Sequence, residues 1–269
     1  MSRFEGSRTL ITGGAAGIGR LLALEAARRG AEVIVWDLAE EAMARTVAEI
    51  TALGQRPAHG YRCDVGDRAQ VYAVAEQVVE EVGPVDILVN NAGVVSGKTF
   101  LELPDERIEL TFRVNTLALF WTTKAFLPGM MRRDRGHVVT VASAAGWIGV
   151  KGLADYSASK FAAVGFDESL RQELKANAPG VHTTVVCPYY IDTGMFEGVK
   201  TRFPAILPIL EPEKVALEIA DAIARNRTRL MLPPIVYSVP LLRGLPLRAF
   251  DRVANVLGIN ASMEEFKGR

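Results

Sequence analysis

Short runs of β-branched and aliphatic residues alternate with longer segments of helical period along most of the chain. This alternation is typical of βαβ units, in which each strand joins a parallel sheet and each helix crosses back over one of its faces. The runs predict strands at residues 9–12, 32–36, 60–63, 85–89, 137–141, 182–187 and 229–232. The intervals predict helices at residues 17–29, 40–53, 68–82, 105–131, 155–176 and 212–224. We therefore expect an α/β fold, a doubly wound parallel sheet of about seven strands with helices on both faces.

A single domain is expected to account for the whole chain. Its 269 residues, of which 49% are hydrophobic, are enough for one large core. No repeat, low-complexity tract or linker marks a second domain within residues 1–269. Residues 197–210 and 233–250 break the alternation, because they are apolar, punctuated by proline and irregular.

Composition argues against several kinds of partner. The formal net charge is zero, so the chain has no overall basic footprint for nucleic acid. The first residues lack an apolar stretch, and no apolar run approaches the ~18 residues of a membrane helix. Cys63 and Cys187 lie far apart in predicted strands, which favours buried thiols in a reducing compartment. Since the three histidines are scattered, we expect no metal site. The buried thiols and the short apolar runs together predict a cytoplasmic protein with no transmembrane segment.

A glycine-rich turn joins the first predicted strand to the first predicted helix. It reads Thr-Gly-Gly-Ala-Ala-Gly-Ile-Gly over residues 12–19 and contains Gly13, Gly17, Ile18 and Gly19. Glycines let the backbone approach a pyrophosphate, whose charge is met by the free N–H groups at the helix amino terminus. This context favours a dinucleotide site, although glycines also serve tight turns that bind no ligand.

Asp37 ends the second predicted strand. In dinucleotide-binding folds an acidic residue about this far beyond the glycines accepts hydrogen bonds from the adenosine ribose. A carboxylate here would repel the 2′-phosphate of NADP, and the neighbours Leu38 and Ala16 offer no cation to hold it. The pattern therefore favours NAD. Asp37 also has capping-box spacing to Glu40, so it could start the next helix at the same time.

Small and polar residues follow the third, fourth and fifth predicted strands. They are Asp64 and Val65, then Asn90, Asn91, Ala92 and Gly93, and finally Ser143. Ligands of open α/β sheets sit beyond the carboxyl ends of the strands, so these residues are candidates for a binding site. A serine at such a position can donate a hydrogen bond to a substrate oxygen. Taken alone, Asn-Asn-Ala-Gly is typical of a turn, and Ser143 is more often a turn residue or a helix cap.

Tyr156 and Lys160 stand one helical turn apart in the stretch Tyr-Ser-Ala-Ser-Lys. Positions i and i+4 share a helix face, so the phenol oxygen and the ammonium can converge on one small region. A nearby cation favours phenolate and lowers the pKa of the phenol, which would make a tuned acid/base. Taken alone, the five residues are better explained by an amphipathic helix with a half-buried tyrosine and a solvated lysine.

In their joint order and spacing these motifs resemble the short-chain dehydrogenase/reductase family, in its single-domain branch with a Rossmann-like sheet. The resemblance runs from about residue 8 to residue 232. It rests on TGGAAGIG, Asp37, Asp64-Val65, NNAG, Asn115, Ser143, YSASK, and Pro188 with Thr193.

The resemblance implies an NAD-dependent alcohol dehydrogenase or carbonyl reductase. Tyr156 would exchange a proton with the substrate oxygen, and Lys160 would lower the Tyr156 pKa and bond the nicotinamide ribose. Ser143 would position the substrate oxygen. Asn115 would hold a water that passes the proton out through Lys160, although an amide inside a long helix can also serve only the backbone. The residues expected to bind the cofactor are Gly13, Gly17, Ile18, Gly19, Asp37, Asp64, Val65, Asn91, Ala92, Gly93, Tyr156, Lys160, Pro188, Ile191 and Thr193.

The chain departs from most relatives after Pro188, where it has Tyr189 in place of glycine. With the apolar residues that follow, this is similar to the subgroup of retinol dehydrogenases and long-chain or 17β-hydroxysteroid dehydrogenases. We expect residues 195–210 to form a lid over a hydroxy fatty acid, fatty alcohol, retinoid or steroid; packing in the core or between subunits is the alternative. The expected substrate contacts are Ser143, Trp147, Tyr156, Tyr189 and Phe196.

This interpretation divides the domain into three parts. Residues 1–140 would mainly bind the cofactor, residues 141–232 would carry catalysis and substrate binding, and residues 233–269 would form an apolar extension. The arginines within residues 225–252 are expected to contact another subunit, with a peripheral membrane contact or a substrate carboxylate as alternatives. The resemblance also implies a homodimer or homotetramer. The alternative function is a non-catalytic, NAD(H)-sensing regulator, a class that typically loses the Tyr or Lys that this chain keeps.

Overall fold

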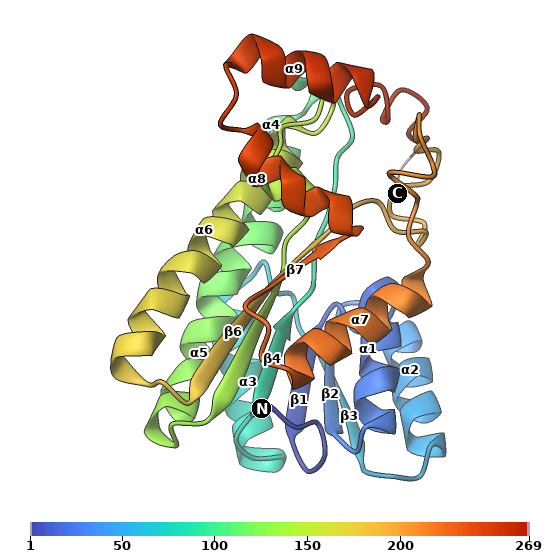
Figure 1. The fold of residues 1–269 in the computed structure, drawn as a ribbon. Coiled ribbons are helices and arrows are strands. Elements are labelled where there is room, and N and C mark those ends of the chain that lie inside the picture. The colour runs from blue at the N-terminus through green and yellow to red at the C-terminus, as the bar shows by residue number, and fades with distance from the viewer. Residues whose placement is uncertain (1, 268–269) are drawn as a thin grey trace.

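The computed structural model describes residues 2–267. Its centre is a seven-stranded parallel sheet in the order β3-β2-β1-β4-β5-β6-β7 (Figure 1). The strands are β1 (Arg8–Thr12), β2 (Glu32–Asp37), β3 (Ala58–Arg62), β4 (Ile87–Asn90), β5 (Gly136–Val141), β6 (Val181–Pro188) and β7 (Arg229–Leu232). The direction of strand order reverses between β1 and β4, so a crevice for a ligand is expected beyond the carboxyl ends of these two strands.

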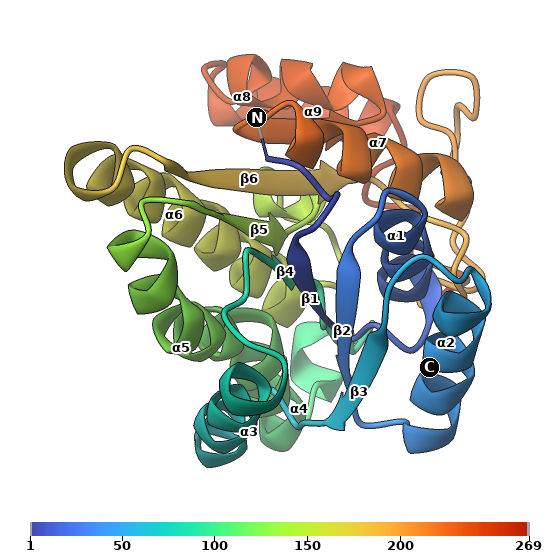
Figure 2. The same cartoon turned by 90° about the horizontal axis from the view of Figure 1, so that it is seen from below.

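Helices cover both faces of the sheet (Figure 2). One face carries α1 (Gly17–Arg28), α2 (Glu40–Ala52) and α7 (Pro212–Ala224). The other carries α3 (Arg68–Glu81), α4 (Asp105–Phe112), α5 (Ala118–Arg132) and α6 (Ala154–Asn177). Because the central strands are covered on both sides, β1, β4 and β5 are buried at nearly every position, without alternation. The predicted fold class is confirmed, and the predicted strands and most helices differ from the observed ones only at their ends.

The predicted helix over residues 105–131 is not continuous. A π-helical turn, Arg113–Leu117, separates α4 from α5. The side chain of Asn115 in this turn bonds the backbone of Val94 and the hydroxyl of Ser159. Turns of this kind often occur at functional sites, because the extra residue reorients side chains within a helix.

Residues 233–250 were expected to be irregular, and that prediction was wrong. The structure has a 3₁₀ turn, Pro234–Ser238, followed by α8 (Val239–Leu242) and α9 (Leu247–Val256). The prolines that suggest breaks stand at the start of each element, where a missing N–H costs nothing. Both helices lie across the carboxyl-end side of the sheet (Figure 1). Residues 197–210 stay largely irregular, although Leu210 forms an isolated bridge with Ile191.

Within residues 2–267, no helix has the length and apolar character needed to cross a bilayer.

Candidate active site

A cavity of about 620 Å³ opens at the carboxyl ends of the strands and continues beneath α8 and α9. All fifteen residues predicted to bind the cofactor line it. Of the residues predicted for catalysis and substrate binding, Ser143, Tyr156, Lys160, Tyr189 and Phe196 line it as well. Residues that were predicted from separate motifs along the chain therefore line the same cavity.

The glycine-rich turn fits a dinucleotide pyrophosphate. Gly17, the first residue of α1, has a φ of +52°, a backbone conformation that favours glycine. A side chain at Gly19 would collide with the carbonyl oxygen of Gly13 and lie 2.6 Å from the amide nitrogen of Asn91. Ala16 gives α1 no side-chain cap among the described residues, so the N–H groups of the first turn are left for an anion.

Asp37 is tied to the same turn. Its Oδ2 accepts the N–H of Ala15 at 2.9 Å, and its Oδ1 accepts the N–H of Ala39 at 3.0 Å. The N-cap of α2 is Ala39, so Asp37 supports the approach to the helix without being its capping residue. Each carboxylate oxygen can accept a further bond, which leaves capacity for the two ribose hydroxyls of NAD.

The turn after β4 is clamped by its own side chains. The Asn91 amide donates to the carbonyl oxygens of Thr12 and Gly13, at 3.0 and 3.1 Å, and so joins this turn to the glycine-rich one. Asn115 accepts the Val94 N–H at 2.8 Å and donates to the Val94 carbonyl at 2.9 Å. Asn115 itself lies behind the cavity wall and is buried. Its amide is engaged by protein groups, and its role in holding a water stays a prediction.

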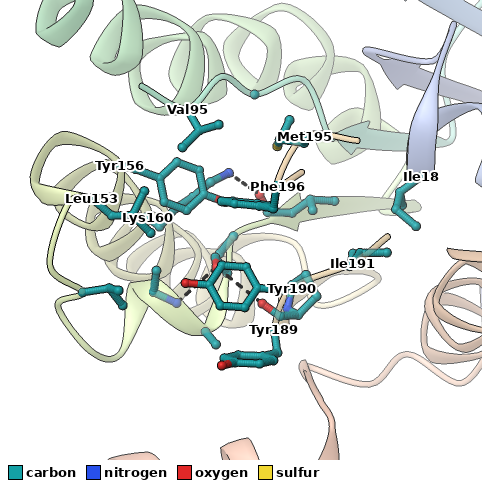
Figure 3. Close-up of a pocket in the computed structure, with 18 of the residues that line it drawn as sticks. Ile18, Val95, Leu153, Tyr156, Lys160, Tyr189, Tyr190, Ile191, Met195 and Phe196 are labelled. Carbon is teal, nitrogen blue, oxygen red and sulfur yellow. Dashed lines mark hydrogen bonds between the residues drawn. The ribbon is translucent and has the colours of Figure 1, made fainter. Parts of the chain in front are cut away.

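Tyr156 and Lys160 lie side by side on α6 at the cavity (Figure 3). The Lys160 Nζ is 5.6 Å from the centroid of the Tyr156 ring and donates to the Val141 carbonyl at 2.9 Å. Burial lowers the pKa of Lys160 to about 8. Burial raises the pKa of Tyr156 above its ordinary value, against a smaller lowering by the Ser143 hydroxyl. The expected lowering of the Tyr156 pKa by Lys160 is thus not seen in the protein alone, where burial raises that pKa.

Ser143 stands at the end of β5 and begins a 3₁₀ turn, Ala144–Gly146. Its Oγ accepts the N–H of Ala145 at 3.1 Å, so its alternative role as a cap is real. The hydroxyl donates over a long 3.4 Å distance to the Pro188 carbonyl. Its proton can therefore turn toward a substrate oxygen without breaking a strong bond.

Aromatic rings enclose the substrate side of Tyr156 (Figure 3). Phe196 meets the Tyr156 ring edge to face, with centroids 5.7 Å apart. Tyr190 packs between Phe196 and Tyr189, at centroid distances of 5.1 and 4.6 Å. The Tyr190 hydroxyl and the Ser262 hydroxyl share a hydrogen bond of 2.9 Å. Sequence reasoning missed Tyr190, since its partner lies 72 residues away and no local pattern indicates the contact.

Trp147 was predicted to contact substrate, and this contact stays a prediction. It lies outside the residues that line the cavity. Its indole N–H donates to the Cys187 sulfur at 3.3 Å, and the Arg229 guanidinium lies over its ring, 4.5 Å from the centroid. The 3₁₀ turn after Ser143 directs the indole toward β6 and β7.

The predicted lid forms one wall of the cavity only in part. Met195, Phe196, Ile206 and Leu207 line the cavity, whereas Val199, Phe203 and Leu210 of the same segment do not. The carboxyl-terminal elements supply the rest of the wall, which sequence reasoning missed. These residues are Ile235, Val236, Val239 and Leu242, followed by Phe250, Val253, Ala254, Leu257 and Ile259.

Few charged residues line the cavity. The charged lining residues within 2–267 are Asp37, Asp64 and Lys160, together with Arg107 on α4. None of them comes from residues 189–259, which line the substrate side. Several arginines of the carboxyl-terminal region bind their own chain: Arg225 pairs with Asp221, and Arg243 donates to the Trp147 carbonyl at 2.8 Å. Within residues 2–267, no group of three His, Cys, Asp or Glu side chains gathers into a metal site.

Comparison with known proteins gives a consistent result. The short chain dehydrogenase family pattern matches residues 7–202. Epidermal retinol dehydrogenase 2 of Mus musculus is 46% identical over 266 residues, which cover 98% of this chain and 86% of the relative. Retinol dehydrogenase 10-B of Danio rerio is 43% identical, over 97% of this chain and 85% of the relative.

A solved structure with the same fold carries a cofactor. It is a short chain dehydrogenase/reductase from Burkholderia phymatum in complex with NAD. The two chains are 30% identical, with a TM-score of 0.82 over 91% of this chain and 95% of the other.

Proposed function

The chain belongs to the short-chain dehydrogenase family and is an NAD(H)-dependent oxidoreductase, and we propose that its substrate is a neutral, hydrophobic alcohol of retinoid or long-chain type, interconverted with its aldehyde or ketone. The names of the curated relatives favour a retinoid. A long fatty alcohol or a hydroxysteroid fits the same chemistry.

In the proposed mechanism the protein moves one proton while the cofactor takes the hydride. When bound, NAD⁺ would supply the hydride acceptor and would add positive charge beside Tyr156. The Tyr156 oxygen takes the alcohol proton, and the Ser143 hydroxyl donates a hydrogen bond to the substrate oxygen. Lys160 uses one N–H on Val141 and keeps two donors for the ribose hydroxyls. Gly13, Gly17, Ile18 and Gly19 would hold the pyrophosphate, and Asp37 the adenosine ribose.

The apolar substrate side of the cavity carries the proposal. A substrate carboxylate bound there would lose its hydration without gaining a cationic partner from residues 189–259. This argues against a hydroxy fatty acid whose carboxylate lies among residues 189–259. An apolar chain gains about 0.8 kcal/mol for each CH₂ that it buries, which is about fourfold in affinity.

A substrate panel tests the proposal. NAD reduction should be measured with all-trans-retinol, 1-hexadecanol, a 17β-hydroxysteroid and 2-propanol, and with 16-hydroxyhexadecanoate as the charged match of 1-hexadecanol. We expect kcat/KM for at least one large neutral alcohol to exceed that for 2-propanol at least about 100-fold, because several CH₂ groups are buried. Equal turnover of short alcohols, or a preference for the hydroxy acid, would refute the assigned substrate class.

The remaining expectations are proposals as well. Exposed Leu117 at the end of the π-helical turn, Phe120 on α5 and Phe161 on α6 support a homodimer or homotetramer through these helices. Size-exclusion chromatography with light scattering can measure the number of subunits. A cytoplasmic location and the division at residues 140 and 232 stay predictions. The non-catalytic alternative predicts NADH binding without turnover of any alcohol in the panel.

A further inference from the structure

Asp155, the residue before Tyr156, carries a buried carboxylate. It is 4% exposed and lies in the first turn of α6. Its Oδ2 accepts the Ser96 hydroxyl at 2.9 Å and the Thr111 hydroxyl at 2.8 Å. Its Oδ1 is buried and has no hydrogen-bond partner among residues 2–267. A buried carboxylate with one unpaired oxygen lowers the stability of the fold. A contribution to stability therefore does not account for Asp155.

The two hydroxyls come from different walls of the site. Ser96 lies in the segment after β4, where Val95 packs in one apolar cluster with Leu153 and Tyr156. The same segment passes close to Lys160, since a side-chain carbon at Gly93 would lie 3.7 Å from Nζ. Thr111 is buried on α4. One carboxylate thus ties the turn that carries Tyr156 to both the facing wall and α4.

Helix capping does not explain these contacts. The N-cap of α6 is Leu153, and no side chain caps its first turn. An acidic residue in a first turn benefits from the helix dipole while exposed to solvent, so burial is not needed for that effect. The bonds of Asp155 instead act between segments 44 and 59 residues apart in sequence.

We propose that Asp155 is a positioning residue that fixes Tyr156 relative to the cavity wall formed by residues 93–96. It touches no reacting atom and acts through the hydroxyls of Ser96 and Thr111. This inference rests on the proposed role of Tyr156 in proton transfer.

Variants of Asp155 test the inference in the full chain with NAD and the best alcohol of the panel. Asp155→Ala should lower kcat at least about tenfold with KM for NAD within about threefold, because small displacements of a catalytic group are costly. Asp155→Asn should restore kcat to within about threefold, since its amide oxygen can still accept both hydroxyls. Thr111→Val combined with Ser96→Ala should reproduce the loss while keeping the carboxylate. Ser157→Ala is the matched control, because this neighbouring hydroxyl is buried without a partner among residues 2–267.

Melting temperatures separate positioning from folding. Asp155→Asn should melt no lower than the wild type, because it removes a buried charge. Unchanged kcat in Asp155→Ala and in the double variant would overturn the inference while leaving the proposed function intact. The inference also fails if Asp155→Asn is as impaired as Asp155→Ala, or if the kcat losses follow the losses in melting temperature. Absence of turnover in the wild type would instead overturn the proposed function.

Discussion

Replacing Lys160 by methionine is expected to change how the stability of the protein depends on pH. Burial moves the Lys160 pKa from its ordinary value of 10.5 to about 8. Below pH 8 the ammonium is charged in both states, and the folded protein bears the whole cost of burying it. Between pH 8 and 10.5 the folded lysine is already neutral while the unfolded one still binds its proton. Stability of the wild type therefore rises with pH across this window.

The magnitude follows from the same pKa. Each tenfold change in proton affinity is worth about 1.36 kcal/mol, so the buried charge costs about 3 kcal/mol of unfolding free energy at pH 7. By pH 10 most of this cost is gone, and the wild type should gain about 2–3 kcal/mol relative to Lys160→Met between the two pH values. Methionine also leaves the Val141 carbonyl without its bond, but that loss is the same at both pH values.

Urea unfolding of both proteins without cofactor, at pH 7 and pH 10, measures this difference. Burial raises the pKa of Tyr156, Tyr189 and Tyr190, so they stay neutral in both folded proteins and ionise alike in both unfolded ones, and their contributions cancel in the comparison. Lys175→Met is the control, because Lys175 is exposed on the same helix and keeps its hydration on folding. A stability difference between wild type and Lys160→Met that does not change with pH would refute the buried-ammonium argument.

Three further substitutions probe the cavity and its surroundings. Gly19→Ala should weaken NADH binding at least about tenfold in a fluorescence titration, because the new carbon collides with the Gly13 carbonyl; wild-type affinity would contradict the assigned turn. Asp37→Ala should lower the ratio of kcat/KM for NAD over NADP about tenfold or more, since it removes a charged hydrogen-bond acceptor; an unchanged ratio would show that Asp37 does not select the cofactor. Trp147→Phe should leave KM for the alcohol within about twofold and cost about 1 kcal/mol of stability, the worth of its indole bond to Cys187; a large rise in KM would place Trp147 at the substrate after all.

Much of the cofactor side could be predicted from the sequence, because its signals are local. The glycine-rich turn, Asp37 and the residues after β3 and β4 each follow a strand directly, and parallel strands bring their carboxyl ends to one edge. Strand and helix boundaries were also close to those observed, since they depend on short-range periodicity.

The substrate side could not be predicted in the same way, because it depends on distant contacts. Tyr190 is held by Ser262, and α9 closes the cavity from far along the chain. The π-helical turn at Asn115 depends on a bond to Val94, which no periodic pattern encodes. The orientation of the Trp147 indole depends on its hydrogen bond to Cys187 on β6, 40 residues along the chain. The raised pKa of Tyr156 follows from burial, which the five-residue motif alone did not indicate.

Turnover by Tyr156→Phe tests the central claim most directly, because phenylalanine keeps the ring and removes only the oxygen that exchanges the proton. NADH affinity and alcohol-dependent NAD reduction should be measured on the same preparation. We expect NADH affinity within about threefold of the wild type and a loss of kcat of at least about 100-fold, in the range of a lost general base. Retention of near-normal kcat would contradict the role of Tyr156 as the acid/base of this enzyme.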